Sequence, residues 1–352
     1  MDLIELRQNI DRIDSEIVWL LNQRMEFALR TKKLKAQIPD LEREKQVIAG
    51  IRQQAYDLLR PDFSGQLFQE IIAETKRVQE QHKRLIGFQG EHGAYSELAV
   101  RSFDFESIPI PHKEFVDVFS AVRDGTLDLG MIPVENSIAG SVTQVNDLLL
   151  ETDLHVLGEV YLDVHHCLLA LPDTDYRDIR VVYSHPQALE QCRGFLSRTE
   201  LEVRPYYDTA GAAMMLARER PQATAAIASQ FCERLYNLEI LKENIEDDAA
   251  NTTRFLVLSA NERNAHGDKC SVIFSTPHTP GALYNVIRMF AESGVNLTRI
   301  ESRRLPKQPG RYAFLLDFQG KSDDPKTQAM MEQVARNTTM FRILGWYHDS
   351  NR

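Results

Sequence analysis

The segment LLNQRMEFALRTKKLK, residues 20–35, lies in a long run whose apolar residues recur at alternating spacings of three and four. Those apolar residues are Leu3, Leu6, Ile10, Ile13, Ile17, Leu20, Phe27, Leu34 and Ile38. This spacing predicts an α-helix with a coiled-coil seam. The seam position between Leu20 and Phe27 holds Arg24, and an unpaired buried charge is costly. The fold of this segment therefore depends on what neutralises Arg24.

The chain of 352 residues, 43% hydrophobic and 26% charged, has the composition of a soluble globular protein with two or three domains. No run is apolar enough to span a bilayer, and the charged, amphipathic start has the features of neither a signal peptide nor a transit peptide. The four cysteines are scattered along the chain, which favours reduced thiols. We therefore expect a cytoplasmic protein that does not bind membranes.

Charge is distributed unevenly along the chain. Residues 1–84 contain 15 Lys and Arg against 14 Asp and Glu, a net of +1, and the remainder contains 26 basic against 37 acidic residues, a net of −11. This acidic body argues against nucleic acid as the main partner. A cation on the seam of the first helix instead predicts a small anionic ligand.

Residues 1–83 predict an all-α domain of three helices. The first helix runs over residues 3–37, the second over residues 40–59, and the third over residues 67–81, after Gly65. At about 1.5 Å per residue the first helix is roughly 50 Å long, and neither shorter helix covers that length. Much of its apolar seam needs another chain, so we expect at least a homodimer.

Residues 84–262 alternate short apolar runs with helical stretches, which is typical of an α/β domain. Ligands of such domains collect where strands end and helices begin. After a polar link, residues 269–352 follow the order βαββαβ of an α+β, ferredoxin-like domain. This last domain contains few reactive residues, so we do not expect it to be catalytic.

Three cations lie on or beside the seam of the first helix, namely Arg7, Arg24 and Lys35. The axial rise is about 26 Å between Arg7 and Arg24 and about 16 Å between Arg24 and Lys35. Two long side chains can bridge the shorter distance within one chain, whereas Arg7 can join them only from an antiparallel partner chain. The alternative is that Arg24 extends to solvent or pairs with a glutamate.

Further motifs favour a ligand. The motifs ELR, NQR, KLK and DLERE, followed by two residues spaced by four on the third helix, resemble the all-helical chorismate mutase family. The matching residues are Arg7, Arg24, Lys35, Asp40, Arg43, Glu44, Thr75 and Gln79. The resemblance implies that chorismate is the substrate and rearranges to prephenate within one molecule. The reaction needs no nucleophile, metal or cofactor.

A site assists this rearrangement by holding the dicarboxylate folded and by stabilising charge on the breaking ether oxygen. The resemblance implies that Arg7 from a partner chain, Arg24 and Arg43 bind the carboxylates through paired hydrogen bonds. It also implies that Lys35 and Gln79 donate to the ether oxygen. Glu44 and the turn at Asp40 would accept from the ring hydroxyl.

Residues 85–259 carry six motifs, in the order GFQGEHGAYS, PVENSIAGSV, HHCL, YSHPQ, DTAGAA and NTTRF. Together they resemble the prephenate dehydratase family. This implies two α/β lobes around a cleft, as in periplasmic binding proteins, and loss of carbon dioxide and water from prephenate to give phenylpyruvate. It also implies that Thr253 hydrogen-bonds the leaving hydroxyl.

The sequence leaves the proton donor of this dehydration open. The candidates are Glu135, with a pKa raised in a dry cleft, and a protonated His185. We interpret Asn136, Ser137 and Gln187 as residues that hold the substrate. Arg254 either binds a substrate carboxylate or forms a structural ion pair.

The sequence HHC at residues 165–167 could suggest a metal site. However, adjacent strand residues point to opposite faces and no further ligand cluster follows, so we expect packing and no metal. The glycine-rich GFQGEHGAYS predicts a tight turn before a helix, since the GxGxxG spacing of a dinucleotide loop is absent.

The last segment resembles an ACT regulatory domain of the phenylalanine-binding kind through TPGAL and IESRR. Gly281 permits close backbone approach to a ligand, and Asn296 with the ESR strand would line an interface between two such domains. The resemblance implies that the effector L-phenylalanine binds between paired domains and lowers activity. The residues concerned are Gly281, Ala282, Leu283, Asn296, Glu301, Ser302 and Arg303. The alternative is a dimerisation module without a ligand.

We therefore predict a multi-domain, bifunctional enzyme of phenylalanine biosynthesis that is inhibited by phenylalanine and is at least dimeric. One rival is a non-catalytic amino-acid sensor, which would bind ligands without turnover. A second rival keeps only the dehydratase active. The nearly complete set of matching residues in the first segment argues against the second rival.

Overall fold

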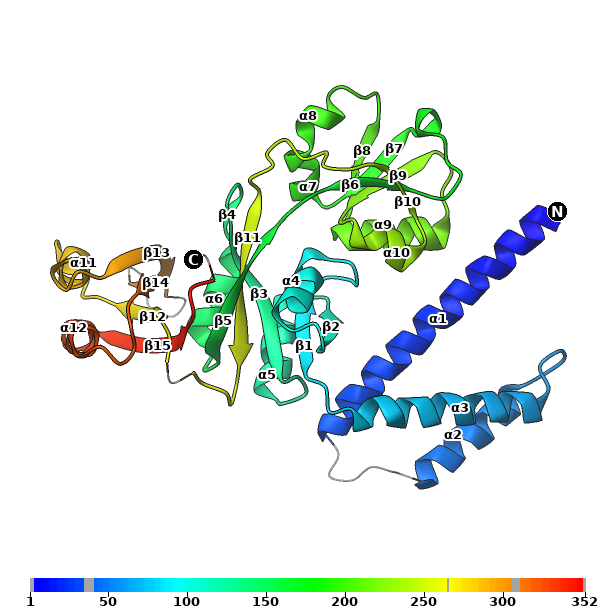
Figure 1. Ribbon diagram of the computed structural model, residues 1–352, viewed down its shortest axis with the longest axis horizontal. Coiled ribbons are helices and arrows are strands. Elements are labelled where there is room, and N and C mark those ends of the chain that lie inside the picture. Colours follow the sequence, from blue (N-terminus) through cyan, green and yellow to red (C-terminus); the bar gives the residue numbers. More distant parts are fainter. Residues whose placement is uncertain (1–2, 35–40, 265, 306–310, 351–352) are drawn as a thin grey trace. The chain divides into compact units, whose positions relative to one another are not determined.

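The computed structural model describes residues 3–34, 41–264, 266–305 and 311–350. The chain divides into two compact units, residues 1–85 with 125–127, and the remainder. The first unit is helical, and the second contains three β-sheets (Figure 1).

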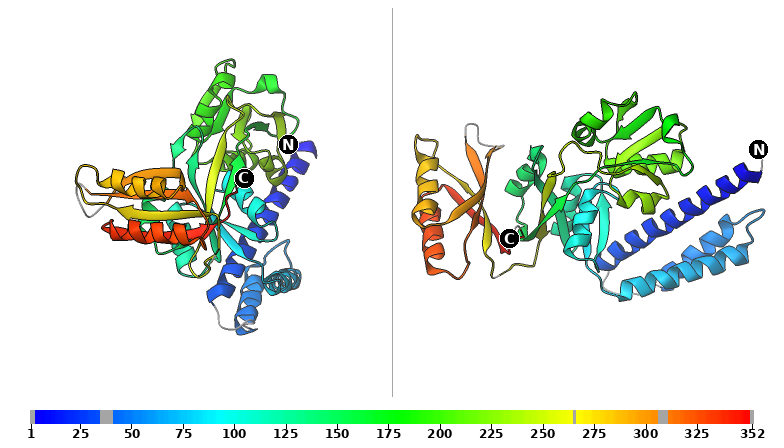
Figure 2. Two further views of the ribbon diagram at one scale, coloured as in Figure 1. Left: turned by 60° about the vertical axis from the view of Figure 1, so that its left-hand side comes forward. Right: turned by 45° about the horizontal axis from the view of Figure 1, so that its top comes forward.

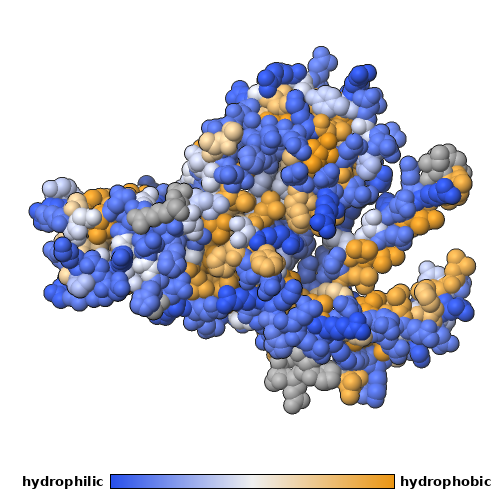
Figure 3. All heavy atoms as spheres, in the orientation of Figure 1, coloured by the Kyte–Doolittle hydropathy of each residue, from blue (hydrophilic) through white to orange (hydrophobic). Residues whose placement is uncertain are grey.

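The helical unit consists of α1 (Leu3–Leu34), α2 (Leu41–Gln54) and α3 (Pro61–Glu80). No glycine or proline interrupts the 32 residues of α1. The N-terminal part of α1 stands apart from α2 and α3 in both views of the unit (Figures 1 and 2). The described seam residues are exposed by 46% (Leu6) to 69% (Leu34), and hydrophobic side chains line this helix on its surface (Figure 3).

The third helix begins earlier than predicted, at Pro61, and includes Gly65. Proline fits the first helical turn, where its missing N–H is not needed. Gly65 is buried, and a β-carbon there would lie 2.5 Å from Nε of Arg52 on α2. Close packing of two helices therefore explains a glycine that the sequence suggested as a break. The second helix ends at Gln54 rather than near Leu59.

The first lobe of the second unit is a mixed sheet with the strand order β2-β1-β3-β11-β5, and β4 pairs with β3. Its strands are β1 (Leu85–Gln89), β2 (Ile108–His112), β3 (Leu129–Asn136), β4 (Gly140–Ser141), β5 (His155–Asp163) and β11 (Thr252–Ser259). Its helices are α4 (Tyr95–Phe103), α5 (Phe115–Arg123) and α6 (Thr143–Glu151). Strand β11 runs antiparallel to β3 and β5, between them.

The second lobe has the strand order β10-β6-β9-β7-β8. Its strands are β6 (Cys167–Ala170), β7 (Val181–Ser184), β8 (Glu202–Pro205), β9 (Thr224–Ala228) and β10 (Glu239–Lys242). Its helices are α7 (Pro186–Gln191), α8 (Arg193–Leu196), α9 (Thr209–Glu219) and α10 (Phe231–Tyr236), besides one short 3-10 turn, Tyr176–Asp178. The chain enters this lobe after β5 and returns to the first lobe through β11. The two-lobed α/β fold that we predicted is confirmed.

The C-terminal domain contains β12 (Lys269–Ser275), α11 (Ala282–Glu292), β13 (Asn296–Arg304), β14 (Tyr312–Gln319), α12 (Pro325–Arg336) and β15 (Met340–Tyr347). The strand order β13-β14-β12-β15 is antiparallel throughout, which confirms the ferredoxin-like topology. Both helices cover the same face of the sheet (Figure 2). An apolar core lies between them and that face, whereas the opposite face carries buried polar residues, among them Lys269, Ser271 and Asp317.

This polar face packs against the first lobe, and β15 contacts β5. A β-carbon at Gly345 would lie 2.0 Å from the carbonyl oxygen of Val156, so the two backbones meet at this point. Glycine is the residue that permits such an approach. The C-terminal sheet and the first lobe are therefore in direct contact.

Candidate functional sites

Arg24 points from α1 toward α3. Its Nη1 donates a hydrogen bond to the hydroxyl of Thr75 at 2.9 Å, and that hydroxyl donates to the carbonyl oxygen of Ile71 at 2.7 Å. Within the part of the chain that the structure describes, Arg24 forms no ion pair with a carboxylate. Burial lowers the pKa of its guanidinium. Arg24 is thus a partly buried cation without a carboxylate partner among the described residues, which excludes a described glutamate as the predicted alternative partner.

Other predicted residues gather around the same helix pair. Nε2 of Gln79 donates to the carbonyl oxygen of Ala28 at 2.7 Å, and Nζ of Lys32 donates to the carbonyl oxygen of Gln79. Glu44 on α2 pairs with Lys76 on α3 at 2.8 Å. Sequence analysis missed Lys32 and Lys76. Lys76 lies on α3 and meets Glu44 through tertiary packing, which no local spacing indicates.

Two further predicted residues of the helical unit, Arg7 and Arg43, have exposed side chains, and Arg7 lies far from Arg24 along α1. Lys35 and Asp40 lie outside the described residues. The single chain therefore brings together Arg24, Thr75 and Gln79, with Glu44 paired to Lys76 nearby on the second and third helices.

The second candidate site lies at the end of the β3/β11 ladder. Asn136 and Thr253 are paired across the two strands, and Nδ2 of Asn136 donates to Oγ1 of Thr253 at 2.9 Å. The same Nδ2 lies 2.7 Å from Oδ1 of Asn251. Oδ1 of Asn136 accepts from the backbone N–H groups of Ile138 and Ala139. These two backbone donors fix the amide orientation of Asn136.

The orientation of the Asn136 amide determines how the hydroxyl of Thr253 is bonded. Its oxygen accepts a hydrogen bond from Asn136, and no described residue accepts its hydroxyl proton. A threonine hydroxyl has one proton to donate. Thr253 therefore presents a proton to whatever lies in front of it. Asn136 itself is fully engaged with the protein, so it positions Thr253 and does not present a free amide to a ligand.

Ser137 holds the loop after β3 against the start of β11. Its hydroxyl donates to the carbonyl oxygen of Ala250 at 3.1 Å and accepts from the backbone N–H of Thr252 at 2.9 Å. Arg254, in contrast, is 2% exposed and lies among carboxylates. It pairs with Glu135 at 3.0 Å and with Glu159 at 2.7 Å, so the geometry favours the structural ion pair over binding of a substrate carboxylate.

The two candidate proton donors, Glu135 and His185, both have partners within the protein. Glu135 forms ion pairs with Arg254 and Arg299. Burial lowers the pKa of His185, and its Nδ1 accepts a hydrogen bond from the backbone N–H of Gln187 at 3.3 Å, as the N-cap of α7. Both features favour the neutral imidazole. Gln187 is exposed at the start of the same helix.

Both histidines of the HHC motif contact side chains from other parts of the chain. His166 is buried between the hydroxyl of Tyr95 at 2.8 Å and Oε1 of Gln191 at 2.9 Å. Burial lowers the pKa of His166. His165 instead pairs with Glu246 at 2.7 Å. Among the described residues, no group of three potential His, Cys, Asp or Glu ligands is found. Tyr95 and Gln191 were not predicted, since they are distant from the motif in sequence.

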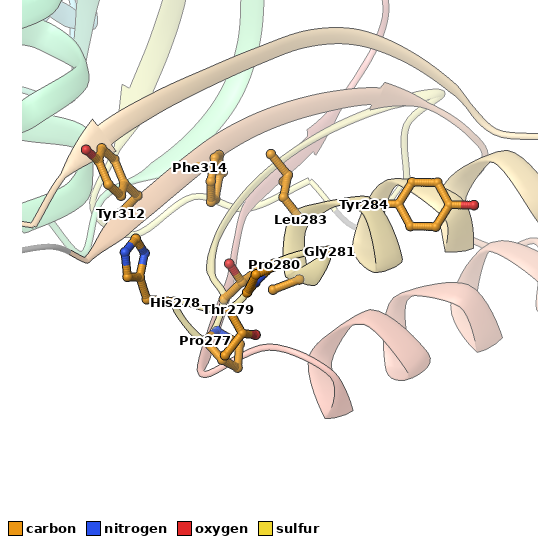
Figure 4. A pocket seen from close by; sticks show the side chains of 11 residues that line it. Pro277, His278, Thr279, Pro280, Gly281, Leu283, Tyr284, Tyr312 and Phe314 are labelled. Atoms are coloured by element: carbon orange, nitrogen blue, oxygen red, sulfur yellow. The ribbon is translucent and has the colours of Figure 1, made fainter.

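A cavity of about 460 Å³ lies at the start of α11 in the C-terminal domain. Its lining consists of residues 276–284 with Tyr312 and Phe314 from β14 (Figure 4). Gly281 caps α11 with a φ of 81°, a left-handed conformation that favours glycine. The predicted residues Gly281, Ala282 and Leu283 therefore line the cavity.

The other predicted regulatory residues lie on β13, away from this lining. Nδ2 of Asn296 donates a hydrogen bond to Oε1 of Gln319 at 3.0 Å. Arg303 donates to both carboxylate oxygens of Asp147 on α6 at 2.7 and 2.8 Å. Glu301 and Ser302 lie on the same strand, at the edge of the sheet. Sequence analysis missed Tyr312 and Phe314 because strand pairing, not sequence proximity, brings β14 to the cavity.

Comparison with known proteins identifies the families of the first two segments. The family model described as chorismate mutase type II matches residues 6–80, and the model described as prephenate dehydratase matches residues 86–263. A bifunctional chorismate mutase/prephenate dehydratase of Aquifex aeolicus is 32% identical over 98% of both chains. An arogenate dehydratase/prephenate dehydratase of Arabidopsis thaliana is 38% identical over 82% of this chain and 78% of its own length.

A solved structure is also similar. It is a prephenate dehydratase from Arthrobacter aurescens in complex with L-Phe, 29% identical, with a TM-score of 0.69 over 76% of this chain and 90% of that chain. No helix among the described residues is long and apolar enough to cross a membrane.

Proposed function

Because the chain belongs to the family of bifunctional chorismate mutase/prephenate dehydratases, we propose that Arg24 and Thr253 are the central residues of its two reactions. The chain is both a chorismate mutase and a prephenate dehydratase. We assign the mutase to residues 1–83, the dehydratase to residues 84–262 and regulation to residues 269–352.

In the mutase, Arg24 is partly buried and has no carboxylate partner among the described residues, which supports binding of an anionic substrate. A guanidinium matches a carboxylate through two parallel hydrogen bonds. Chorismate has two carboxylates, so Arg24 holds one, and the hydroxyl of Thr75 fixes the guanidinium from behind. Lys35 and Gln79 stabilise charge on the ether oxygen, and Glu44 and Asp40 bind the ring hydroxyl. No proton transfer or covalent intermediate is needed.

The mutase site is completed by a second copy of the chain. The described seam of α1 exposes eight apolar residues by 46% or more, and such an apolar stripe is stable when another helix covers it. An antiparallel copy of α1 would bring its Arg7 toward Arg24, and Arg43 is exposed where a ligand carboxylate can reach it. We therefore propose a homodimer in which each mutase site takes Arg7 from the partner chain.

In the dehydratase, the assignment rests on the hydroxyl of Thr253, which accepts from Asn136 and has no acceptor for its own proton among the described residues. Carbon dioxide leaves with its bond electrons moving into the ring, and the hydroxyl at the opposite ring carbon departs as hydroxide. A hydrogen bond from Thr253 stabilises the negative charge that develops on this oxygen. Asn136 positions the threonine, Ser137 holds the loop, and Gln187 with the neutral His185 contacts the substrate from the second lobe.

Phenylalanine inhibition fits the cavity of the C-terminal domain. Its lining supplies the apolar Leu283 and Phe314 for a ring and the N-terminus of the 11-residue α11 for a carboxylate. The edge strand β13, with Asn296, Glu301 and Ser302, is available to a second domain, and Arg303 on the same strand is held by Asp147. We also place the enzyme in the cytoplasm, because its four cysteines are free and buried.

One experiment tests this function. Purified protein is given chorismate, and prephenate and phenylpyruvate are followed with and without phenylalanine. Thr253→Ala should lower phenylpyruvate formation at least 100-fold, roughly the loss of one transition-state hydrogen bond of about 3 kcal/mol, while chorismate is still consumed at the wild-type rate. Normal phenylpyruvate formation by this variant would reject the role of Thr253. Binding of both substrates without turnover would identify the sensor alternative.

A further inference from the structure

The strand pair β3/β11 presents different residues on its two faces. Thr253 pairs with Asn136, and the next pair is Arg254 with Glu135. Successive residues of a strand point to opposite faces. Thr253 and Asn136 therefore lie on one face, and Arg254 with Glu135 on the other. The reacting hydroxyl and the ion pair behind it share the same stretch of backbone.

The C-terminal sheet completes this ion pair. Asp317 on β14 is 1% exposed, and its Oδ2 accepts from Nη1 of Arg254 at 2.6 Å. Arg299 on β13 lies 3.6 Å from Oε2 of Glu135 and 3.9 Å from Asp317. Glu135 thus has one arginine at each carboxylate oxygen, one from each domain. Basic and acidic residues alternate around the ring that Arg254, Glu135, Arg299 and Asp317 form, and two of its ion pairs cross between the domains.

Because the network is buried, removing a single charge from it is costly. Burial alone would raise the pKa of Asp317, but Arg254 and Arg299 outweigh it and hold this pKa below its ordinary value. Removing one partner of a buried ion pair leaves the other charge uncompensated, which costs far more than loss of a surface pair. The position of Arg254 is therefore determined by Asp317 as well as by its own lobe.

We propose that Asp317 and Arg299 are positioning residues of the dehydratase, through which the C-terminal domain fixes Arg254 and Glu135 and so the hydroxyl of Thr253. The inference rests on the proposed role of Thr253. Neither residue touches the substrate. Both act through the β3/β11 backbone, and displacement of a reacting group by about 1 Å can lower a rate 100-fold.

A double-mutant cycle tests this proposal. Asp317→Asn keeps the size of the side chain and removes its charge, and it should lower kcat for prephenate at least tenfold. In the Thr253→Ala chain, assayed at high enzyme concentration, the same substitution should lower the residual kcat less than twofold, because no hydroxyl remains to be positioned. A substitution that merely unfolds part of the population lowers both rates by the same factor. Equal factors in both backgrounds, or no effect in either, would overturn the proposal.

Asp147→Asn is the matched control. Asp147 pairs with Arg303 in the same interface, and among the described residues it forms no ion pair with Arg254. The kcat of Asp147→Asn for prephenate should stay within twofold of the wild-type value. A loss of kcat as large as that of Asp317→Asn would also overturn the proposal. Chorismate consumption and a thermal melt confirm that each variant is folded.

A second variant covers the case in which Asp317→Asn does not fold. Arg299→Gln leaves the contact between Asp317 and Arg254 intact, and it should lower kcat at least threefold with the same dependence on Thr253. An unchanged kcat would contradict the role of Arg299. Failure of the proposed function itself is recognised separately, because Thr253→Ala alone would then retain full activity.

Discussion

Replacing Arg24 by leucine should stabilise the helical unit and abolish its activity at the same time. Arg24→Leu restores the apolar residue that the seam of α1 requires. The wild-type arginine has one hydrogen bond, to Thr75, and the hydroxyl of Thr75 keeps its bond to Ile71 when Arg24 is removed. Burial lowers the pKa of Arg24, so the folded unit without ligand disfavours this charge.

The expected magnitudes follow from these contacts. Loss of the hydrogen bond costs about 1 kcal/mol, and half-burial of a leucine side chain contributes about 1 kcal/mol. Because a desolvated charge is also removed, we expect a net gain of about 1 kcal/mol, a rise in Tm of roughly 4–8 °C for a domain of this size. Two charge-assisted hydrogen bonds to a carboxylate are worth about 3–6 kcal/mol. Their loss lowers the mutase rate roughly 10²- to 10⁴-fold.

The assay combines thermal unfolding at fixed protein concentration with chorismate consumption and, as an internal control, prephenate dehydration. The matched control is Arg30→Leu, which removes a cation of the same helix that lies outside the seam pattern. We expect it to keep the mutase rate within twofold and to give no comparable rise in Tm. A lower Tm for Arg24→Leu together with persistent mutase activity would refute the role of Arg24 as an anion-binding residue.

Two further predictions concern the dehydratase unit. Gly281→Val places a β-branched residue at a φ of 81° beside the cavity. The phenylalanine concentration for half inhibition should therefore rise at least tenfold. An unchanged value would place the effector elsewhere. Burial lowers the pKa of His166 in the folded state. The neutral, buried imidazole therefore contributes to the free energy of unfolding above the unfolded-state pKa of about 6.5, and this contribution is lost as the pH falls through the lower pKa of the folded state. His166→Phe should therefore reduce the decline in unfolding free energy between about pH 7 and pH 5, measured by denaturant titration, and an unchanged decline would show that other groups cause it.

The sequence predicted most of the fold, because the fold depends on local periodicity. The spacing in α1 and the order βαββαβ of the C-terminal domain are both visible in short windows of sequence. The start of α3 was missed because Gly65 acts through tertiary packing against Arg52. Local propensity cannot show such a contact.

The sites were predicted less completely, for a related reason. Arg254 was singled out from its motif, but its partners Glu159 and Asp317 are 95 and 63 residues away along the chain. No local pattern indicates that these carboxylates meet it. The same holds for the Tyr95–His166 contact, which spans 71 residues. The motifs predicted candidate residues, and only the structure showed that Asn136 donates a hydrogen bond to Thr253.

Strand β14 explains how an effector can act on Thr253 without reaching it. Tyr312 and Phe314 lie on the face of β14 that carries the cavity lining, whereas Asp317 lies on the opposite face and binds Arg254 at 2.6 Å. A ligand that shifts β14 therefore changes the distance in a buried ion pair, where the energy depends steeply on separation. Coupling between two binding sites is reciprocal, so under the proposed inhibition a substrate that requires Thr253 in its active position weakens phenylalanine binding by the same factor. The proposed inhibition would then depend on the charged interface and so on both domains.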